Sequence, residues 1–475
     1  MFLEQDSGQR DSALNKHLGA STVANAQSAN ALSAVEAARK ILAGTLSSVD
    51  LVKACLARIK ETDGELKAWV HLDADHALAQ AEEMDTIRRA GRPVGPLHGV
   101  PIGLKDIIDT RDFPTERGTP IYSGRKPASD AALVERLREA GAVILGKTAS
   151  TELAFVHAAE TRNPHNPEYS PGGSSSGSAA AVAAFHVPLA IGTQTNGSVI
   201  RPAAFCGTYG FKPTRGVISR RGILQTSKSL DQVGVFGRTL EDVALLSDVI
   251  GGYDPSDDLS YARPRPKMLE GSRAEASIPP DLVWLDLPYH DRLSEDARAG
   301  LDEVVAALGA RVVRATVSEN MTGLVDVQRV IHEYEICHHL EDVFAEHWDM
   351  LSDSLRPIIE RGRTISDEQY QEALEVMASG AEFFEVFFRD YDAVIAPSAA
   401  GEAPKFGGGT GDPVFSTIWT LCGLPALNLP LLVGQNGLPV GVQLIGAAEE
   451  DDRLLRTANW MLNELQSGAA SEQGG

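Results

Sequence analysis

The chain has 475 residues, of which 43% are hydrophobic and 23% are charged, so its composition excludes the disordered and fibrous classes for the bulk of the sequence. Its 43 basic residues stand against 65 acidic ones, a formal net charge of −22, which argues against nucleic acid or an anionic membrane surface as the main partner. No apolar run approaches the roughly 18 residues of a membrane span, and the N-terminus lacks the pattern of a signal peptide. We therefore expect a cytoplasmic protein.

Short apolar runs alternate along the chain with stretches of helical spacing. Residues 1–30 are rich in Ala, Ser, Asn and Gln, and residues 462–475 end in Gly, Ala and Ser, so both ends are predicted to be mobile. Residues 31–461 are predicted to form a single domain. Helices are predicted at 50–59, 77–89, 131–140, 178–185 and 295–308. A strand followed by a loop is predicted at 100–108, and further strands are predicted at 142–145, 187–191, 282–285, 312–315, 393–396 and 440–445. This alternation indicates an α/β sheet covered by helices on both faces.

Residues 321–388 are helical in pattern over almost their whole length, so we predict a helical insertion between strands of the sheet. The cysteines are widely scattered, at Cys55, Cys206, Cys337 and Cys422. They form no C-x-x-C pair, which argues against a disulfide framework and against a structural zinc site.

Two short motifs match catalytic patterns without the context that those patterns require. Residues 141–148 (GAVILGKT) fit the phosphate-binding loop G-x-x-x-x-G-K-[ST], but positions 142–145 are best interpreted as a strand, so nucleotide binding is not expected. Residues 173–177 (GSSSG) fit G-x-S-x-G, in which the serine directly follows a strand. The stretch before them contains three prolines and is interpreted as a loop. A Ser175 nucleophile with a histidine and an acid is the rival hydrolase hypothesis.

Three histidines, His332, His338 and His339, lie in one helical stretch near two glutamates. Their spacing is not that of the zinc motif H-E-x-x-H. We therefore expect exposed residues on a helix face rather than a metal site.

A stretch rich in Gly, Ser and Ala, from Gly172 to Pro213, contains core-like apolar runs, which argues against a flexible linker. With segments elsewhere in the chain it resembles the amidase signature family, from about Ala31 to Met461. The other matching segments are 98–106 (HGVPIGLKD), 229–234 (SLDQVG), 422–426 (CGLPA) and 437–443 (GLPVGVQ). The resemblance implies a large mixed β-sheet covered by helices on both faces, with the mostly helical insertion beside the substrate pocket.

The Ser-cisSer-Lys triad of this family falls on three residues. Lys105 matches the lysine, Ser174 the serine that follows a cis peptide bond from Gly173, and Ser198 the nucleophile. A serine hydroxyl needs a base to take its proton. A lysine can be that base only when it is neutral, and burial among apolar residues favours the neutral form. On residue type alone, a surface Lys105 paired with Asp106 is the simpler interpretation.

Thr195, Asn196, Gly197 and Ser198 correspond to the oxyanion hole of the family, where backbone N–H groups face the developing negative charge. The chain departs from the family in two places. Gln194 stands where Asp is common, which puts any charge-based structural role there in doubt, and Asn196 stands where Gly is common. Asn tolerates a positive φ better than most residues, so we expect the loop to form.

Substrate contacts are predicted at Arg201, Ser175, Gly173 and Trp419. In malonamidase-like members the arginine that matches Arg201 binds a substrate carboxylate. A structural arginine paired with a carboxylate of the protein is the alternative interpretation.

The pocket walls are predicted to come from residues 321–388 and 406–419. The aromatic side chains of these segments suit a bulky apolar substrate group, with ordinary core packing as the alternative. They are Tyr334, Phe384, Phe415 and Trp419.

The resemblance implies an amidohydrolase that cleaves a C–N amide bond through a Ser198 acyl-enzyme, with Ser174 as relay and Lys105 as base. Esters, anilides and carbamates present a similar carbonyl. A small-molecule amide and water are the expected partners, without a metal, cofactor, nucleic acid or membrane, and a homodimer is compatible with the sequence. The motifs stand closest to stand-alone malonamidase-like and aryl amidase-like members. The alternatives are the glutamine amidase subunit of a tRNA-dependent amidotransferase, whose pattern residues 149–153 (ASTEL) do not follow, and a non-catalytic scaffold.

Overall fold

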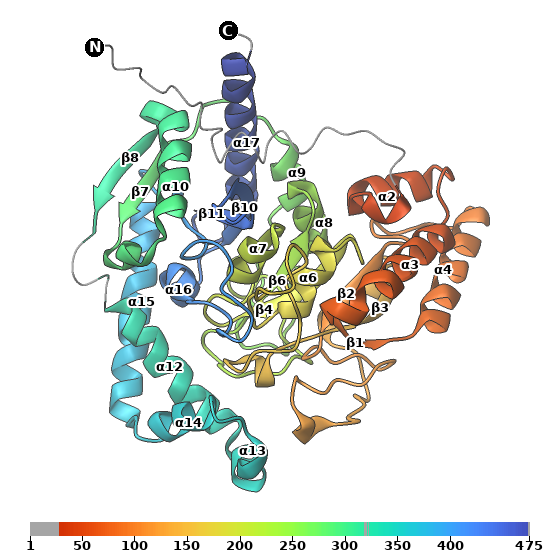
Figure 1. The fold of residues 1–475 in the computed structure, drawn as a ribbon, viewed down its shortest axis with the longest axis horizontal. Coiled ribbons are helices and arrows are strands. Elements are labelled where there is room, and N and C mark those ends of the chain that lie inside the picture. The colour runs from red at the N-terminus through yellow and green to blue at the C-terminus, as the bar shows by residue number, and fades with distance from the viewer. Residues whose placement is uncertain (1–27, 318–320, 322, 474–475) are drawn as a thin grey trace, which may run out of the picture.

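The computed structural model describes residues 28–317, 321 and 323–473. In this part of the chain one 11-stranded sheet has the strand order β1-β3-β2-β4-β6-β5-β10-β11-β9-β7-β8. The strands are β1 (Trp69–Leu72), β2 (Pro101–Lys105), β3 (Val143–Thr148), β4 (Leu189–Gln194), β5 (Tyr209–Lys212), β6 (Gln232–Gly237), β7 (Leu282–Asp286), β8 (Val312–Thr316), β9 (Ala393–Pro397), β10 (Ala426–Val433) and β11 (Pro439–Ile445). Figure 1 shows the sheet running across the molecule from β1 to β8.

Helices cover this sheet and extend beyond one end of it. They are α2 (Ala34–Leu42), α3 (Ser48–Leu66), α4 (Ala74–Arg89), α5 (Ala132–Glu139), α6 (Ser176–Ala183), α7 (Ile200–Cys206), α8 (Leu240–Ile250), α9 (Met268–Arg273), α10 (Glu295–Leu308), α12 (Leu324–His339), α13 (Glu341–Glu346), α14 (Arg356–Gly362), α15 (Asp367–Phe387), α16 (Val414–Leu421) and α17 (Asp451–Gln473). Short 3-10 turns are η1 (Ala29–Ala31), η2 (Pro120–Tyr122), η3 (Glu152–Ala154), η4 (Pro288–Arg292), η5 (Gly309–Arg311) and η6 (Trp348–Met350).

The sheet is mixed, as the family resemblance implies. β2 pairs in parallel with both β3 and β4, and β7 pairs in parallel with both β8 and β9. The other neighbouring strands are antiparallel. Because β2 and β4 are parallel neighbours, their carboxyl ends lie at the same edge of the sheet, which is where loops far apart in sequence can meet.

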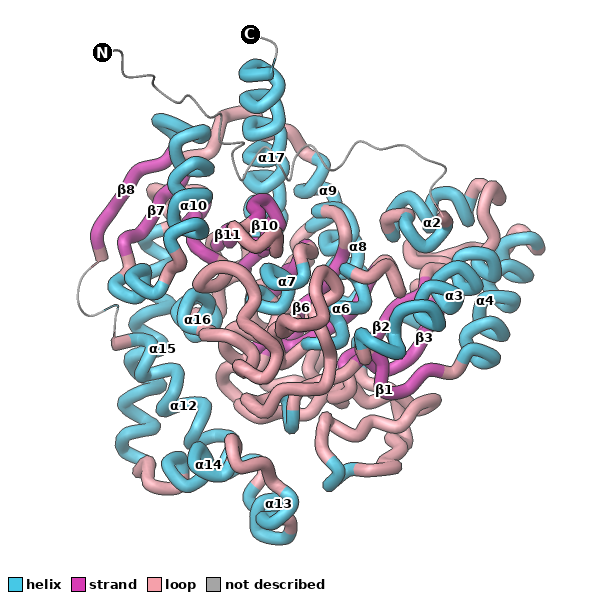
Figure 2. The backbone as a smooth tube through the Cα atoms, in the orientation of Figure 1, coloured by secondary structure: helices cyan, strands magenta, loops and turns pink. Residues whose placement is uncertain are grey.

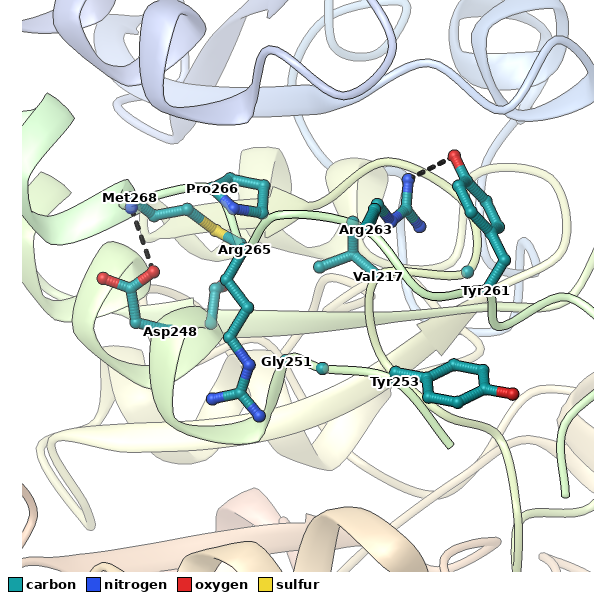
Figure 3. A pocket seen from close by; sticks show the side chains of 12 residues that line it. Val217, Asp248, Gly251, Tyr253, Tyr261, Arg263, Arg265, Pro266 and Met268 are labelled. Carbon is teal, nitrogen blue, oxygen red and sulfur yellow. Dashed lines mark hydrogen bonds between the residues drawn. The ribbon is translucent and has the colours of Figure 1, made fainter. Parts of the chain in front are cut away.

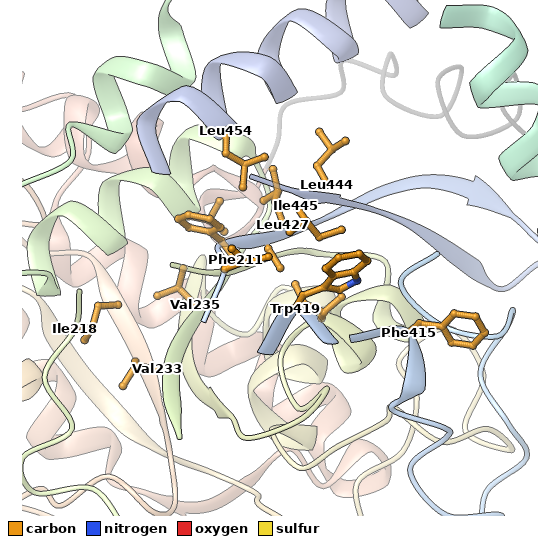
Figure 4. Packing of buried hydrophobic residues seen from close by; sticks show 14 of the residues in the cluster. Phe211, Ile218, Val233, Val235, Phe415, Trp419, Leu427, Leu444, Ile445 and Leu454 are labelled. Carbon is orange, nitrogen blue, oxygen red and sulfur yellow. The ribbon is translucent and has the colours of Figure 1, made fainter. Parts of the chain in front are cut away.

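Both faces of the sheet are buried at its inner strands, whereas the edge strands β1 and β8 are partly exposed, and successive strand residues divide between the two faces. In β3, Val143 and Leu145 pack in one hydrophobic cluster with residues of α3, α4 and α6, whereas Ile144 packs in the other cluster with residues of α8 and α17. Figure 4 shows part of this other cluster, to which Leu454 of α17 and Leu444 of β11 both belong. The predicted α/β fold class with two covered faces is confirmed.

The predicted helical insertion contains α12, α13, α14 and α15, between β8 and β9. Figure 1 shows these helices extending away from the sheet, with α13 at their far end. Loop backbone runs between this insertion and the strands β1 and β2 (Figure 2). The insertion therefore forms a wall at one side of the loop region that follows β2 and β4.

The structure describes a part of each chain end, and the mobility of these ends stays a prediction. Of the N-terminal segment predicted to be mobile, only residues 28–30 are described, and Asn30 is buried and donates to the carbonyl of Phe185 at 3.1 Å. Residues 462–473, predicted as a flexible tail, continue α17 to Gln473. Residues 1–27 and 474–475 lie outside the described residues. Within the described residues, every helix is too short or too polar to cross a membrane.

Candidate active site

Lys105 is the last residue of β2, and its side chain is completely buried. Its Nζ donates to Ser174 Oγ at 2.7 Å and to Thr193 Oγ1 at 2.8 Å. Burial lowers the pKa of Lys105 from 10.5 to about 7, although the charge of Asp231 opposes this shift. Near neutral pH a large fraction of this amine is therefore uncharged.

A surface Lys105 paired with Asp106 is excluded. Asp106 is itself buried, and its Oδ1 lies 3.6 Å from the Nζ of Lys147 on the neighbouring strand β3. Its carboxylate also accepts from the backbone N–H of Glu116. Lys147, rather than Lys105, is therefore the ion-pair partner of Asp106.

Ser174 lies in the loop before α6, and the Gly173–Ser174 peptide bond is cis. The Ser174 side chain is 2% exposed, so Lys105 reaches its hydroxyl without competition from bulk water. The Ser174 carbonyl accepts from the backbone N–H of Thr151, which ties this loop to the segment that follows β3.

Ser198 lies between the end of β4 and the start of α7, where it is half-buried and lines a cavity. Within the described part of the chain its hydroxyl has no hydrogen-bond partner. Gln194 fixes the chain on both sides of it, because Gln194 Oε1 accepts from the backbone N–H of Val199 at 2.8 Å and of Ile200 at 3.0 Å. The neutral amide of Gln194 thus caps the first turn of α7. A charged side chain at this position is not needed for that role.

The segment corresponding to the oxyanion hole is held by neighbours on three sides. Thr195 Oγ1 donates to Asp231, and Asn196 bonds through its side chain to α12 and α16. At Gly197 a Cβ atom would lie 3.2 Å from the Cβ of Pro413, so glycine lets this backbone lie close to the opposite loop. Asn196 is not among the described residues with positive φ, so its tolerance of that conformation is not needed here.

Arg201 lies in the first turn of α7 and is 5% exposed. Its Nη2 donates to the carbonyl of Gly173 at 2.7 Å and to Thr410 Oγ1 at 3.2 Å. Burial lowers the pKa of Arg201 to about 10, although the charge of Asp412 opposes this. Within the described residues no carboxylate lies within the 4 Å of an ion pair, and the buried Nε has no partner. Among the described residues Arg201 therefore makes no ion pair with a carboxylate, and its role in substrate binding stays a prediction.

The cavity beside Ser198 and Arg201 has a volume of about 310 Å³. Its lining includes three arginines and three carboxylates, together with apolar side chains. The charged residues are Arg201, Arg292, Arg329, Asp326, Glu333 and Asp412, and the apolar ones include Phe155, Val156, Val325, Ile358 and Val414. Arg292 pairs with Asp412 at 2.7 Å and Arg329 with Asp326 at 3.5 Å, so Arg201 is the cation of the cavity that has no such partner in the described chain.

The predicted walls are correct as segments, but their aromatic residues are wrong. Trp419 is completely buried and packs edge-on against Phe384, with ring centroids 5.5 Å apart, and Phe415 packs on Tyr289. Tyr334 stacks on Tyr370 outside the cavity. Apolar residues recur around α12 and α16, so the sequence does not distinguish the face toward the pocket from the face toward the core.

Three further predictions are corrected. Ser175 does not line the cavity: it is completely buried, and its hydroxyl donates to the carbonyl of Thr193 and accepts from its N–H, both at 3.2 Å. It therefore has neither the exposure nor the histidine that a nucleophile requires. Gly173 contributes its carbonyl to Arg201 rather than a surface to the cavity. His332, predicted to be exposed, is 9% exposed and lines the cavity, whereas His338 and His339 are exposed.

Sequence reasoning missed Phe155, Gln328 and His332 as cavity residues. The rings of Phe155 and His332 lie 4.4 Å apart, and burial lowers the pKa of His332 to about 3, so this imidazole is neutral. Gln328 and His332 are four residues apart on one helix and therefore share a face. This spacing was the sequence feature from which a shared position at the cavity could have been predicted. Among the described residues no group of three or more His, Cys, Asp or Glu side chains is arranged to hold a metal ion.

A second cavity, of about 180 Å³, lies between α8, α9 and the loop that joins them (Figure 3). Arg263 donates there to the Tyr261 hydroxyl at 2.6 Å, and Asp248 accepts from the N–H of Met268 at 2.9 Å. It contains none of the residues of the predicted triad, so the cavity beside Ser198 is the candidate active site.

A family model and several relatives match most of the chain. The Amidase family model matches residues 50–455. The A subunit of the glutamyl-tRNA(Gln) amidotransferase of Symbiobacterium thermophilum is 36% identical over 489 residues, which cover 94% of this chain and 100% of that protein. The corresponding protein of Nocardia farcinica is also 36% identical, over 89% of this chain and 96% of its own length.

Solved structures of similar fold include amide-hydrolysing enzymes. A chain from a vestigial protein complex that reveals the evolutionary origins of an s-triazine catabolic enzyme has a TM-score of 0.85 at 29% identity, covering 91% of this chain and 98% of that one. The 6-aminohexanoate cyclic dimer hydrolase has a TM-score of 0.81 at 26% identity, covering 91% and 97%. The peptide amidase of Stenotrophomonas maltophilia has a TM-score of 0.75 at 30% identity, covering 91% and 96%.

The family match and the neighbouring structures identify an amide-hydrolysing enzyme of α/β fold. The chain belongs to the amidase family, also called the amidase signature family, and is an amidase acting on C–N amide bonds.

Proposed function

We propose that this amidase cleaves the C–N amide bond of a small molecule through a Ser198 acyl-enzyme, with Ser174 as proton relay and Lys105 as base. The observation that carries the proposal is the 2.7 Å contact between Lys105 Nζ and Ser174 Oγ, made by a buried lysine whose pKa is about 7. A neutral amine has a lone pair, so this contact can carry a proton from Ser174 to Lys105.

In the proposed reaction Ser198 Oγ attacks the amide carbonyl while its proton passes to Ser174, whose own proton passes to Lys105. Backbone N–H groups of residues 195–198 stabilise the negative charge that develops on the carbonyl oxygen. The proton then returns through Ser174 to the nitrogen of the leaving amine, and the C–N bond breaks. A water molecule then attacks the acyl-enzyme ester and gives its proton to the same Ser174–Lys105 relay. The ester bond breaks, the proton returns to Ser198 Oγ and the acid is released. Protein side chains supply every proton transfer, so the scheme requires no cofactor.

The cavity supports a substrate with two unlike parts. Its apolar lining residues, such as Phe155 and Ile358, suit a hydrocarbon or aryl group, and Arg201 suits a carboxylate or a polar carbonyl. A cavity of about 310 Å³ favours a small molecule over a macromolecule.

A second candidate function is that of a glutamine amidase working together with partner proteins in an amidotransferase. The two amidotransferase relatives support it, since they match at 36% identity over about nine-tenths of this chain or more. Against it stands the similarity in fold to a peptide amidase and a cyclic dimer hydrolase, which act on other amides.

A turnover screen of the whole chain tests both candidates. It covers hexanamide, p-nitroacetanilide, malonamate, a phenyl carbamate and glutamine, with Ser198→Ala and Lys105→Ala as variants. We expect release of amine from at least one small amide and loss of this activity in both variants. Turnover by wild type of none of these compounds, or turnover that survives Ser198→Ala, contradicts the proposal. Activity confined to glutamine favours the second candidate.

Arg201→Met separates the roles of that residue. If Arg201 binds a substrate carboxylate, the variant loses activity on malonamate by about 100-fold more than on p-nitroacetanilide, as expected for a buried charge pair. If it only holds the carbonyl of Gly173, both substrates lose activity equally.

A further inference from the structure

Asn196, two residues before Ser198, is bonded on both sides of its side-chain amide. Its Nδ2 donates to Gln328 Oε1 of α12 at 3.0 Å, and its Oδ1 accepts from Thr417 Oγ1 of α16 at 2.7 Å. Its backbone carbonyl accepts from Thr420 Oγ1, also of α16, at 2.5 Å. A glycine in this place can make only the last of these bonds.

Gln328 contacts the same loop a second time, because its Nε2 donates to the carbonyl of Thr195 at 3.1 Å. The Gln328 side chain is 3% exposed, so water does not compete for these bonds. Both ends of one amide group are thus used to orient two consecutive residues of the loop that carries Ser198. The same hydrogen bonds therefore set the orientation of the backbone N–H groups of residues 196 and 197, which share peptide planes with the carbonyls of Thr195 and Asn196.

α12 is joined to the site along one face. His332, one turn after Gln328, lies 3.3 Å from Thr226 Oγ1, and Glu335 accepts from Ser229 Oγ at 2.6 Å. Positions 328, 332 and 335 share a helix face. α12 also lines the cavity with Val325 and Arg329. One helix therefore contacts both the cavity and the loop 195–198.

We propose that Gln328, together with Asn196, is a positioning pair that sets the orientation of the oxyanion loop in this chain. The inference rests on the proposed function, since it assigns the loop 195–198 to the oxyanion. Gln328 itself acts through Thr195 and Asn196. Because a misplacement of about 1 Å in a catalytic group lowers the rate by up to about 100-fold, loss of the pair lowers kcat rather than substrate binding.

The test compares Gln328→Leu with Gln371→Leu, which makes the same replacement at an exposed position of α15. With p-nitroacetanilide, or whichever amide of the screen is turned over, we expect Gln328→Leu to lower kcat by 10- to 100-fold, with KM within threefold of wild type. Gln371→Leu leaves both constants unchanged. A rise in KM alone shows that Gln328 only lines the cavity and overturns the inference.

A double-mutant cycle checks that the two residues act as a pair. Asn196→Gly and Gln328→Leu each lower kcat, and the double variant is expected to lose at least threefold less than the product of the two single losses. Independent effects, which multiply, contradict the pairing.

A second measurement does not depend on turnover. Amide hydrogen exchange of residues 195–198 is expected to speed up by about 10-fold in Gln328→Leu and to stay unchanged in Gln371→Leu, with thermal unfolding showing that both are folded. Unchanged exchange overturns the inference. If wild-type turnover survives Ser198→Ala, the proposed function fails; if turnover depends on Ser198 and Gln328→Leu keeps its kcat, only the positioning role fails.

Discussion

Lys105 Nζ lies 2.7 Å from Ser174 Oγ, although 69 residues separate the two along the chain. The parallel pairing of β2 with β4 explains part of this proximity, because it places the end of β2 beside Thr193, the second acceptor of the Lys105 amine. The loop before α6 then brings Ser174 over the same point. The contact is made within the protein interior, where the charge of a lysine is least stable.

The pH dependence of the reaction should follow Lys105. A base must be neutral to accept a proton, and the pKa of Lys105 is about 7. We expect kcat/KM to rise with pH through this value and to reach a plateau above it, since the neutral fraction rises from about one-tenth to about nine-tenths over two pH units. The measurement is kcat/KM on a neutral amide between pH 5 and 10.

Lys105→Arg is the control for this profile, because a guanidinium stays protonated across the whole range. It should show no rising limb, only a residual rate. A wild-type profile that is flat between pH 6 and 8 contradicts the assignment of Lys105 as the base.

Replacement of Lys105 by methionine should raise stability while it removes activity. The pKa of Lys105 is about 7 in the folded protein and near its ordinary 10.5 in the unfolded chain. Between these values the unfolded chain binds more protons, so the unfolding free energy of wild type rises with pH in this window. A difference of three to four pKa units corresponds to about 4–5 kcal/mol, and the lost bonds to Ser174 and Thr193 offset part of it.

Urea unfolding of wild type and Lys105→Met at pH 7 and pH 10 measures this effect. The variant should be the more stable at pH 7 by about 1–3 kcal/mol, with the difference smaller at pH 10. A variant that is less stable than wild type at both pH values is the contrary outcome.

Gln194 should be needed for both stability and turnover. Gln194→Leu leaves the N–H groups of Val199 and Ile200 buried without their acceptor. Each buried N–H group without an acceptor lowers the free energy of unfolding by about 1–3 kcal/mol, and relaxation of the loop reduces the total loss. We expect a loss of about 2 kcal/mol and at least a 10-fold fall in kcat, because Ser198 adjoins the released turn.

Gln435→Leu is the matched control, since Gln435 is exposed in the turn between β10 and β11. It should change neither the unfolding free energy nor kcat. If Gln194→Leu behaves like this control, the cap does not hold the Ser198 loop.

The fold class could be predicted because burial leaves a regular trace in the sequence. The helix predicted at 295–308 is α10, and the apolar runs at 142–145 and 440–445 belong to β3 and β11. The strands β5 and β6 were missed. Both carry glycine within the strand, at Gly210 and Gly234, where a Cβ atom would meet Ala203 and Val199, and glycine weakens the strand pattern.

The residues of the proposed triad could be named from the sequence, whereas the shape of the cavity could not be predicted from it. Lys105, Ser174 and Ser198 stand in local motifs, so each could be proposed without knowledge of its neighbours in space. Cavity walls depend on how α12, α14 and the loop 410–414 pack together, which is not encoded in any one segment. Trp419 was misplaced for this reason: an aromatic residue near a catalytic loop has the same sequence signature whether it faces substrate or core.

Phe155 and Trp419 should therefore respond oppositely to substitution. Phe155 is half-buried on the cavity wall against His332, whereas Trp419 is completely buried against Phe384. Phe155→Ala removes apolar surface that a bound substrate covers, so KM for an aryl amide should rise by about 10-fold with little loss of stability. Trp419→Phe leaves a void in the core and should lower the unfolding free energy by about 1–3 kcal/mol, with KM within twofold of wild type. Aryl and aliphatic amides measured on both variants, together with urea unfolding, separate the two roles. A rise in KM for Trp419→Phe that exceeds the rise for Phe155→Ala would restore Trp419 as a substrate contact.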